Sequence, residues 1–298
     1  MKSYNRTFFS VVIEFFLKVI HYNNRFKAEK FEKYLYNVDN KKIRSLQDKN
    51  TNNKLSVEKI EGKNVYNIIN PKNNKYQKII VYIHGGGFID NVTSFHVKML
   101  DNLASNINAK ICIPIYPLLP KHSYKDTFEM LKSLYNKLLK ENKEIIFMGD
   151  SAGGTLSISF AEFLKENKQK LPSKIILISP WVDVTMENRE IVKYVKTDPI
   201  LSIYGLKKIG RLWADDLDLK HYMISPIYGN LNGLPPILLT VGTREILYPD
   251  IMDFYNKLVR CNNSVELIVG NKMNHIFPLF PTREAKKVLN DICNFINK

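Results

Sequence analysis

The sequence predicts an α/β protein, in which a mostly parallel, twisted sheet is covered by helices on both faces. Short apolar runs rich in β-branched residues recur from about residue 57 onward, and longer helical patterns separate them. The runs are apolar at nearly every position, which is typical of parallel strands that helices cover on both sides. The length of 298 residues and the hydrophobic share of 45% are sufficient for one large core.

The expected elements alternate along the chain. Apolar runs predict strands at residues 64–69, 78–85, 110–117, 144–150, 174–181, 235–242 and 265–270. Helical patterns lie near residues 94–106, 124–140, 152–168, 250–261 and 281–297. Two segments fall outside this alternation, residues 1–50 and about 184–226. The second is too long for a simple connection between strands, so both segments are candidates for a lid over the sheet.

Charge and cysteine content exclude several classes of protein. The formal net charge of +15 is compatible with a nucleic-acid or anionic-membrane partner. The lysines are scattered, however, and no run of five basic residues occurs, so we expect no nucleic-acid binding. The three cysteines are odd in number and widely spaced, which predicts neither a disulfide framework nor a metal site. We expect a reducing, cytoplasmic location.

Residues 8–20 form an apolar stretch near the N-terminus. The stretch is well short of the ~20 residues that span a bilayer, and charged residues interrupt it. Ser10, Glu14 and Lys18 recur every four positions, so a helix here would carry one thin polar stripe on an otherwise apolar surface. We expect this helix to pack over the protein's own cleft, with peripheral contact to a membrane as the alternative.

The segment GDSAGG at residues 149–154 lies between an expected strand and an expected helix. In that context G-x-S-x-G is typical of a sharp turn that raises a serine hydroxyl above the sheet. Side chains at Gly149 and Gly153 would collide with the neighbouring strand and helix. The N-terminus of the following helix favours an oxyanion beside Ser151. The segment thus indicates Ser151 as a nucleophile, although an ordinary turn with a capping serine has the same pattern.

Three consecutive glycines at residues 85–87 follow the strand expected at 78–85. They should lie at the same sheet edge as the serine turn, and their bare N–H groups allow a negatively charged oxygen to approach. The N–H groups of Gly85, Gly86 and Ala152 are therefore the candidate oxyanion hole. No phosphate-loop signature follows these glycines.

A serine hydroxyl is a weak nucleophile until a base takes its proton. Of the six histidines, only His275 lies beyond the last expected strand, in a loop before the final helix. This position suits the general base of a Ser–acid–His triad.

The acid of such a triad should follow the strand expected at 235–242, where Glu245 and Asp250 are available. We favour Glu245, which comes directly after the strand end. Asp250 follows Pro249 and suits the first turn of a helix. It remains the alternative acid. Asp150 lies too close to the serine to reach a distant histidine.

Five motifs together resemble the hormone-sensitive-lipase family of α/β-hydrolases, in its bacterial acetyl-esterase-like branch. They are HGGGF at 84–88, YPLLP at 116–120, GDSAGG at 149–154, SPWVDV at 179–184 and H-x-F at 275–277, in the family's order. The resemblance implies the α/β-hydrolase fold for a catalytic domain at 51–298. It also implies a helical cap, built from an N-terminal segment at 1–50 and an insertion at about 184–226.

The same resemblance implies a catalytic triad of Ser151, Glu245 and His275, with glutamate where the family usually has aspartate. His84 is expected to brace the oxyanion loop, and Asp150 to support the site. No metal and no other cofactor is implied. Aromatic residues of the cap segments and the oxyanion loop, namely Phe15, Phe16, Phe88 and Trp213, are candidates to line an acyl pocket.

The activity that the resemblance implies is that of a serine carboxylesterase, acting through an acyl-enzyme on small or short-acyl esters, as a monomer or homodimer. Three alternatives stay open. The same machinery suits a small-amide, formamidase-like hydrolase. A non-catalytic relative would keep the fold and bind a ligand in its cleft. A lipid hydrolase would dock on a membrane through residues 8–20.

Overall fold

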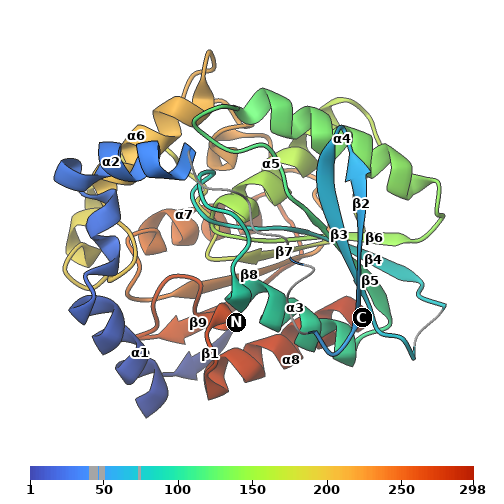
Figure 1. Cartoon of the computed structure of the whole chain (residues 1–298), viewed down its shortest axis with the longest axis horizontal. Helices are drawn as coiled ribbons and strands as arrows, with labels where there is room; N and C mark the ends of the chain where they lie inside the picture. Colours follow the sequence, from blue (N-terminus) through green and yellow to red (C-terminus); the bar gives the residue numbers. More distant parts are fainter. Residues whose placement is uncertain (40–45, 47–50, 73–74) are drawn as a thin grey trace.

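A computed structural model describes residues 1–39, 46, 51–72 and 75–298 of the chain (Figure 1). In this part of the chain one sheet holds the strands β1 (Lys2–Asn5), β2 (Lys54–Ile60), β3 (Lys63–Ile69), β4 (Lys78–Ile83), β5 (Ala109–Pro114), β6 (Glu144–Asp150), β7 (Lys174–Ile178), β8 (Ile237–Gly242) and β9 (Val265–Asn271). Their spatial order is β1-β9-β8-β7-β6-β4-β5-β3-β2. All neighbours pair in parallel except β2 with β3 and β3 with β5. The sheet is mostly parallel, as predicted.

Helices cover both faces of this sheet (Figure 1). The α-helices are α1 (Phe8–Val19), α2 (Ala28–Asp39), α3 (Ser94–Asn106), α4 (Tyr124–Leu139), α5 (Ala152–Glu166), α6 (Ile203–Ala214), α7 (Tyr248–Arg260) and α8 (Arg283–Asn297). Short 3-10 helices are η1 (Tyr22–Phe26), η2 (Arg189–Tyr194), η3 (Pro226–Tyr228) and η4 (Phe277–Leu279). Side chains of α3 and α8 form one core with the sheet, and those of α4, α5 and α7 form the other.

Alternation along the central strands builds the two cores. In β4, Ile79, Val81 and Ile83 belong to one core, whereas Ile80 and Tyr82 belong to the other. This follows from the period of two in a strand, where successive side chains point to opposite faces. Because both faces are covered, the central strands are apolar throughout.

The two edge strands were not predicted. Lys2–Asn5 is short and polar, and it pairs only with β9. Lys54–Ile60 lies at the opposite edge, and most of its side chains are exposed or half-buried. Edge strands commonly carry charged residues, which removes the apolar signal that identifies a buried strand.

The strands β4, β6, β7, β8 and β9 end at one edge of the sheet, because they are parallel and contiguous in the order β9-β8-β7-β6-β4. Polar groups that follow different strands of a parallel sheet meet at this carboxyl edge. The loops after these strands contain the glycines at 85–87, Ser151, Glu245 and His275.

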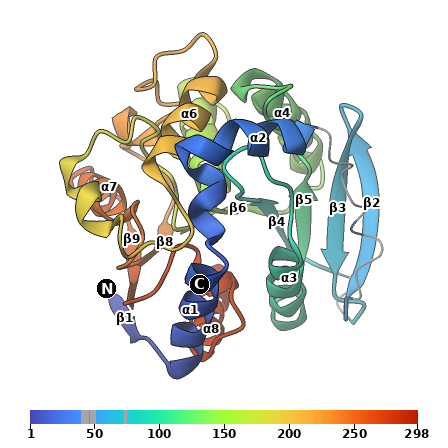
Figure 2. The ribbon, with the colours of Figure 1, turned by 60° about the vertical axis from the view of Figure 1, so that its left-hand side comes forward.

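The N-terminal segment packs on the insertion that follows β7. Helix α2 lies beside α6 in both views of the ribbon (Figures 1 and 2). A Cβ added to Gly205 of α6 would lie 2.7 Å from the Cβ of Phe26, so the two segments touch closely. Asn23 donates a side-chain hydrogen bond to the carbonyl of Asp198 at 3.3 Å. Residues 40–45 and 47–50 of the predicted cap segment lie outside the described residues.

Candidate active site

Ser151 lies in the turn between β6 and α5, in a backbone conformation that side chains rarely adopt. Its φ is 50° and its ψ is −121°, which is a strained conformation for any residue other than glycine. Backbone strain of this kind persists only where the surroundings hold it in place, and it concentrates at functional sites. The glycines make the turn feasible: a Cβ on Gly153 would lie 2.0 Å from the carbonyl oxygen of Ile83, and one on Gly149 2.3 Å from the carbonyl oxygen of Gly153.

Three side chains from different loops meet above this turn. The Oγ of Ser151 lies 2.9 Å from the Nε2 of His275, and the Nδ1 of His275 donates a hydrogen bond to the carboxylate of Glu245. Ser151 is 8% exposed, His275 2% and Glu245 0%. With Nδ1 protonated, Nε2 accepts the serine proton, which is the arrangement of a hydrolytic triad.

The carboxylate of Glu245 is held from three directions. Besides His275, its second oxygen accepts hydrogen bonds from the N–H of Gly242 at 2.7 Å and from the hydroxyl of Ser179 at 2.9 Å. The same hydroxyl accepts from the N–H of Ile276 at 3.1 Å. Ser179 thus ties the acid loop to the histidine loop. The sequence pattern alone does not reveal this role, although the position directly after β7 is where strand-end chemistry is expected.

Asp250, the alternative acid, lies elsewhere. It sits in the first turn of α7, and its carboxylate accepts from the side-chain amide of Asn188 at 2.8 Å. The pKa of Asp250 is raised to about 7, mainly by burial and also by the nearby carboxylates of Asp183 and Asp253, against the lowering effect of the hydrogen bond from Asn188. The structure therefore brings Glu245, and not Asp250, to His275.

The pKa of His275 is raised above its ordinary value. Burial alone would lower this pKa, because it disfavours the charged imidazolium. The negative charge of Glu245 and its hydrogen bond act in the opposite direction and prevail, with a smaller contribution from Asp198. The site therefore stabilises the charged imidazolium of His275.

Asp198 is a buried carboxylate in the insertion, and it was not among the residues predicted for the site. It accepts hydrogen bonds from the N–H groups of Ile200 at 2.8 Å, Leu201 at 3.0 Å and Ile246 at 2.9 Å. Ile246 directly follows the acid of the triad. Asp198 therefore fastens the insertion to the acid loop. No periodic pattern identifies this residue, because its link to the acid loop runs through a backbone group 48 residues along the chain.

The oxyanion loop after β4 differs from our expectation at one glycine. The N–H of Gly85 donates to the carboxylate of Asp150 at 2.8 Å, so it is already paired and not free for an oxyanion. A Cβ on Gly85 would lie 2.3 Å from that carboxylate. The backbone then reverses through positive φ at Gly86 (115°) and Gly87 (62°). In the described part of the chain, the N–H groups of Gly86, Gly87 and Ala152 have no hydrogen-bond acceptor.

Asp150 holds this loop in place through hydrogen bonds. Besides Gly85, it accepts from the hydroxyl of Tyr82 at 2.6 Å and from the Nε2 of His96 at 3.2 Å. The N–H of Thr93 donates to the Nδ1 of His96 at 3.0 Å, which leaves Nε2 as the protonated nitrogen. Burial alone would raise the pKa of Asp150, but His96 and the other donors outweigh it, so the pKa is lowered and the carboxylate is charged.

His84 lies within the oxyanion loop rather than against the serine. Its ring stacks on Tyr116 at a centroid distance of 4.3 Å, and its Nδ1 donates to the carbonyl of Gly85 at 2.8 Å. Tyr116 in turn donates its hydroxyl to the carbonyl of His84 at 2.8 Å. Burial lowers the pKa of His84 to about 4, so the ring is neutral near pH 7. These contacts agree with a bracing role.

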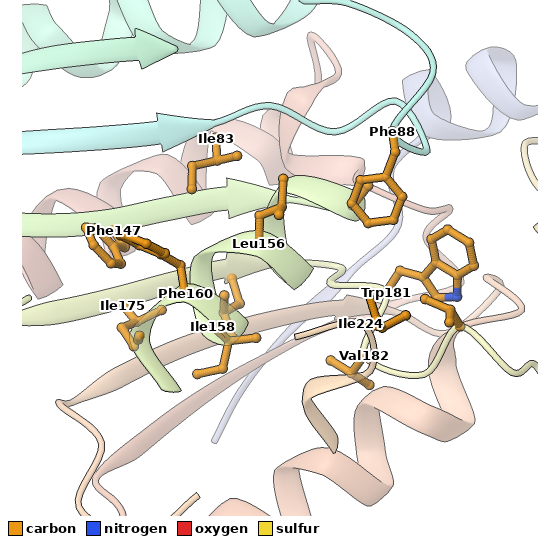
Figure 3. Close-up of a cluster of buried hydrophobic side chains, with 14 of the residues drawn as sticks. Ile83, Phe88, Phe147, Leu156, Ile158, Phe160, Ile175, Trp181, Val182 and Ile224 are labelled. Carbon is orange, nitrogen blue, oxygen red and sulfur yellow. The ribbon is translucent and has the colours of Figure 1, made fainter. Parts of the chain in front are cut away.

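An aromatic stack joins the oxyanion loop to the insertion. Phe88 stacks on Trp213 at 4.1 Å and on Trp181 at 5.7 Å between centroids, and all three rings are buried. Figure 3 shows Phe88 and Trp181 facing each other at one end of the buried cluster that continues beneath the sheet edge. Phe15 and Phe16 do not join this stack. They are 68% and 60% exposed and lie outside the buried stack.

Comparison with known proteins identifies the chain as a hydrolase and places it in a family. Residues 80–279 match the model of a family described as having the alpha/beta hydrolase fold. An esterase from Acinetobacter venetianus is 33% identical over 224 residues, which cover 73% of this chain and 74% of the relative. The chain therefore belongs to the α/β-hydrolase family.

Solved structures agree with this assignment. A protein from Staphylococcus aureus, described as a candidate esterase, has a TM-score of 0.86 and 31% identity, covering 91% of this chain and 94% of its own. EstE7 from a metagenome library, described as a hormone-sensitive-lipase homologue, has a TM-score of 0.82 and 25% identity, covering 97% of both chains. The resemblance to the hormone-sensitive-lipase branch is thus confirmed.

Two further observations complete the description of the site and its surroundings. Among the described residues, no group of three or more His, Cys, Asp or Glu side chains is arranged to hold a metal ion. None of the helices in the described ranges is both long and apolar enough to cross a membrane.

Proposed function

We propose that this protein hydrolyses carboxylic esters of small or short-acyl substrates through a covalent acyl-enzyme on Ser151. The contact of 2.9 Å between the Oγ of Ser151 and the Nε2 of His275, backed by Glu245, carries this proposal. The similarity to an esterase over three-quarters of the chain supports the ester as the substrate class. A non-catalytic relative would have no use for a paired and buried triad of this kind.

The proposed reaction has two halves that share the same groups. The Oγ of Ser151 attacks the carbonyl carbon while Nε2 of His275 takes the hydroxyl proton, and Glu245 stabilises the imidazolium. Collapse of the tetrahedral intermediate breaks the ester bond, and the imidazolium gives its proton to the leaving alkoxide. Water then attacks the acyl-enzyme with His275 as base, which releases the acid and restores the serine.

We assign the oxyanion hole to the N–H groups of Gly86, Gly87 and Ala152. Gly85 is excluded from this set because its N–H is paired with Asp150. Ala152 begins α5, where the first N–H groups of the helix have no intrahelical acceptor. Each donor directed at the developing negative charge is worth roughly 100- to 1,000-fold in rate in related chemistry.

A small acyl group is supported by the crowding beside the nucleophile. The backbone N–H of Trp181 donates to the carbonyl of Ser151 at 3.2 Å. The ring of Trp181 belongs to the buried stack with Phe88 and Trp213. Large, fully packed rings beside the serine resist displacement. We also propose that the N-terminal segment and the insertion form a cap, since Trp213 and Asp198 of the insertion contact the oxyanion loop and the acid loop.

Replacement of Ser151 by alanine tests the proposal. Turnover of p-nitrophenyl acetate by the purified variant should fall by roughly 10,000-fold or more, because no other group supplies the nucleophile. Ser157, a buried serine of α5 that donates to the carbonyl of Gly153 at 2.8 Å, offers a matched control. Ser157→Ala should retain turnover within severalfold. Retained turnover in Ser151→Ala would refute the assignment of Ser151 as the nucleophile. Rates on matched acetyl esters and acetamides would separate ester from amide hydrolysis.

A further inference from the structure

Helix α1 presents an apolar surface to the outside of the molecule. We define the α1 apolar face as the side chains of Phe8, Phe9, Val11, Val12, Phe15, Phe16, Val19 and Ile20. Each of them is between 45% and 77% exposed. A contiguous apolar surface rich in aromatic residues is uncommon on a monomeric protein and marks a surface that binds something. Figure 1 shows α1 at the lower left edge of the molecule.

The polar side of α1 is turned inward, which is the reverse of an ordinary surface helix. Ser10, 7% exposed, donates its hydroxyl to Glu284 of α8 at 2.9 Å. Glu14, 4% exposed, forms ion pairs with Arg6 at 2.8 Å, Lys18 at 2.6 Å and Arg244 at 3.0 Å. A buried carboxylate is costly unless it keeps its partners. Because these partners hold Glu14 inward, the α1 apolar face is held outward.

The charges around the helix indicate what covers this face. Residues 1–33 contain seven Lys or Arg and three Glu, and one of these glutamates is the buried Glu14. Lys2 and Lys18 flank the face with exposed side chains, and the whole chain carries a formal net charge of +15. A second copy of so basic a protein would be repelled, whereas an anionic surface is attracted.

We propose that the α1 apolar face docks the protein peripherally on the interface of an anionic phospholipid membrane. At twelve residues α1 is too short to span the bilayer, so it lies in the plane of the interface with its phenylalanine rings among the acyl chains. The exposed lysines contact the anionic headgroups. The proposal concerns binding alone and does not depend on the proposed hydrolysis.

Docking would bring the catalytic loops close to the lipid. Arg244, which pairs with Glu14, directly precedes Glu245 in the acid loop. Ser10 and Ile13 of α1 line a small crevice together with Met273 and Asn274, the residues just before His275. The helix therefore packs directly on the two loops that supply the acid and the histidine. Esters dissolved in a membrane would reach the protein on this side.

Flotation of the full-length protein with vesicles tests this proposal. Vesicles of phosphatidylcholine with phosphatidylglycerol should bind the protein, vesicles of phosphatidylcholine alone should bind it weakly, and added salt should weaken binding. Phe15→Ser/Phe16→Ser should lower the partition coefficient on anionic vesicles by about tenfold or more, because two rings no longer leave water. The independent pair Phe8→Ser/Phe9→Ser should do the same. Both pairs remove exposed side chains, so circular dichroism should show intact folding.

Val192 and Val195 supply the matched control, since they are apolar and 70% and 46% exposed but lie at η2. Val192→Ser/Val195→Ser should leave vesicle binding unchanged. Equal binding of wild type and both phenylalanine variants would overturn the proposal, as would equal binding to neutral and anionic vesicles. A dimer in sedimentation experiments that dissociates on Phe15→Ser/Phe16→Ser, without vesicle binding by the wild type, would assign the face to a second copy instead and also overturn it.

Discussion

Two of the buried carboxylates in this protein, Asp150 and Glu14, are held by different kinds of partner. Asp150, beneath the oxyanion loop, accepts hydrogen bonds from a hydroxyl, a backbone N–H and a histidine N–H. Glu14, beneath α1, is surrounded by the cations of Arg6, Lys18 and Arg244. Directional donors orient single backbone groups, whereas an ion cluster holds a whole element against its neighbour. The first arrangement suits a site for chemistry, and the second suits a helix that faces outward.

This difference implies that catalysis should be sensitive to changes in the hydrogen-bonded region and insensitive to changes in the ion cluster. The reason is how directly each carboxylate contacts the catalytic loops. Asp150 contacts the residue that begins the oxyanion loop, and Glu245 contacts the base itself. Glu14 reaches the acid loop only through the side chain of Arg244.

The largest effect is expected for Glu245→Gln. The amide no longer stabilises the imidazolium or fixes the histidine tautomer, so turnover should fall by roughly 1,000- to 10,000-fold. His275 must be neutral to take the serine proton, and Glu245 raises its pKa, so wild-type activity falls as pH drops through that raised value. In the variant this acidic limb should move to lower pH. Rates of p-nitrophenyl acetate hydrolysis measured across pH check both expectations.

Asp250→Asn is the matched control for that variant, because it alters the other candidate acid. Its turnover should stay within severalfold of wild type and its acidic limb should not move. If Asp250→Asn reproduced the loss and Glu245→Gln did not, the assignment of the acid would be reversed.

An intermediate effect is expected for Asp150→Asn. If the new amide keeps its oxygen on the N–H of Gly85 and the hydroxyl of Tyr82, its N–H₂ faces the Nε2–H of His96, which places donor against donor and shifts the side chain that holds the loop. We expect a loss of about 1–3 kcal/mol in the free energy of unfolding, from urea titration. Turnover should drop roughly 10- to 100-fold, because small displacements of positioned groups are costly in catalysis.

Asp183→Asn is the control that separates the loss of stability expected for Asp150→Asn from its loss of turnover. Asp183 is also a buried carboxylate, and it accepts from the N–H of Thr185 at 2.9 Å and the hydroxyl of Tyr228 at 2.7 Å. This variant should lose stability but retain turnover. Equal loss of activity in both variants would mean that stability alone, and not the oxyanion loop, explains the effect at Asp150.

The smallest effect on activity is expected for Glu14→Gln. Removing the charge leaves three cations without their partner and should lower the free energy of unfolding by about 1–3 kcal/mol. Turnover should stay within about twofold, because no reacting group touches Glu14. Chemical unfolding and esterase kinetics on the same preparation make the comparison. A large loss of turnover would show that α1 positions the acid loop through Arg244.

Much of the fold could be predicted because buried parallel strands carry a strong signal. The runs around Ile80, Ile146 and Leu239 are apolar on both faces, and the structure places strands there within a few residues of the expected bounds. The polar edge strands β1 and β2 lack that signal. The sequence also predicted the polar stripe of α1 but not its direction, because periodicity defines faces and not which face is covered.

The part of the site that follows from strand ends and turn geometry could be predicted. Ser151, Glu245 and His275 follow strands that the pattern identifies, and the structure brings them into contact. The N–H of Gly85 is taken by the carboxylate of Asp150, 65 residues away, and the order of residues does not reveal this pairing. Asp198 and His96 act through contacts with Ile246 and Asp150, which are distant in sequence, so a single sequence offers no pattern for them. Ser179 directly follows β7, and that position is the only signal for it.

The most direct test of the central claim is covalent labelling of the folded protein by a fluorophosphonate, followed by mass spectrometry of its peptides. The account predicts one rapidly formed adduct on the peptide that contains Ser151. It also predicts that labelling is lost in Ser151→Ala and greatly slowed in His275→Ala, since the hydroxyl needs its base. Adduct formation at another residue, or labelling of wild type no faster than that of His275→Ala, would contradict the account.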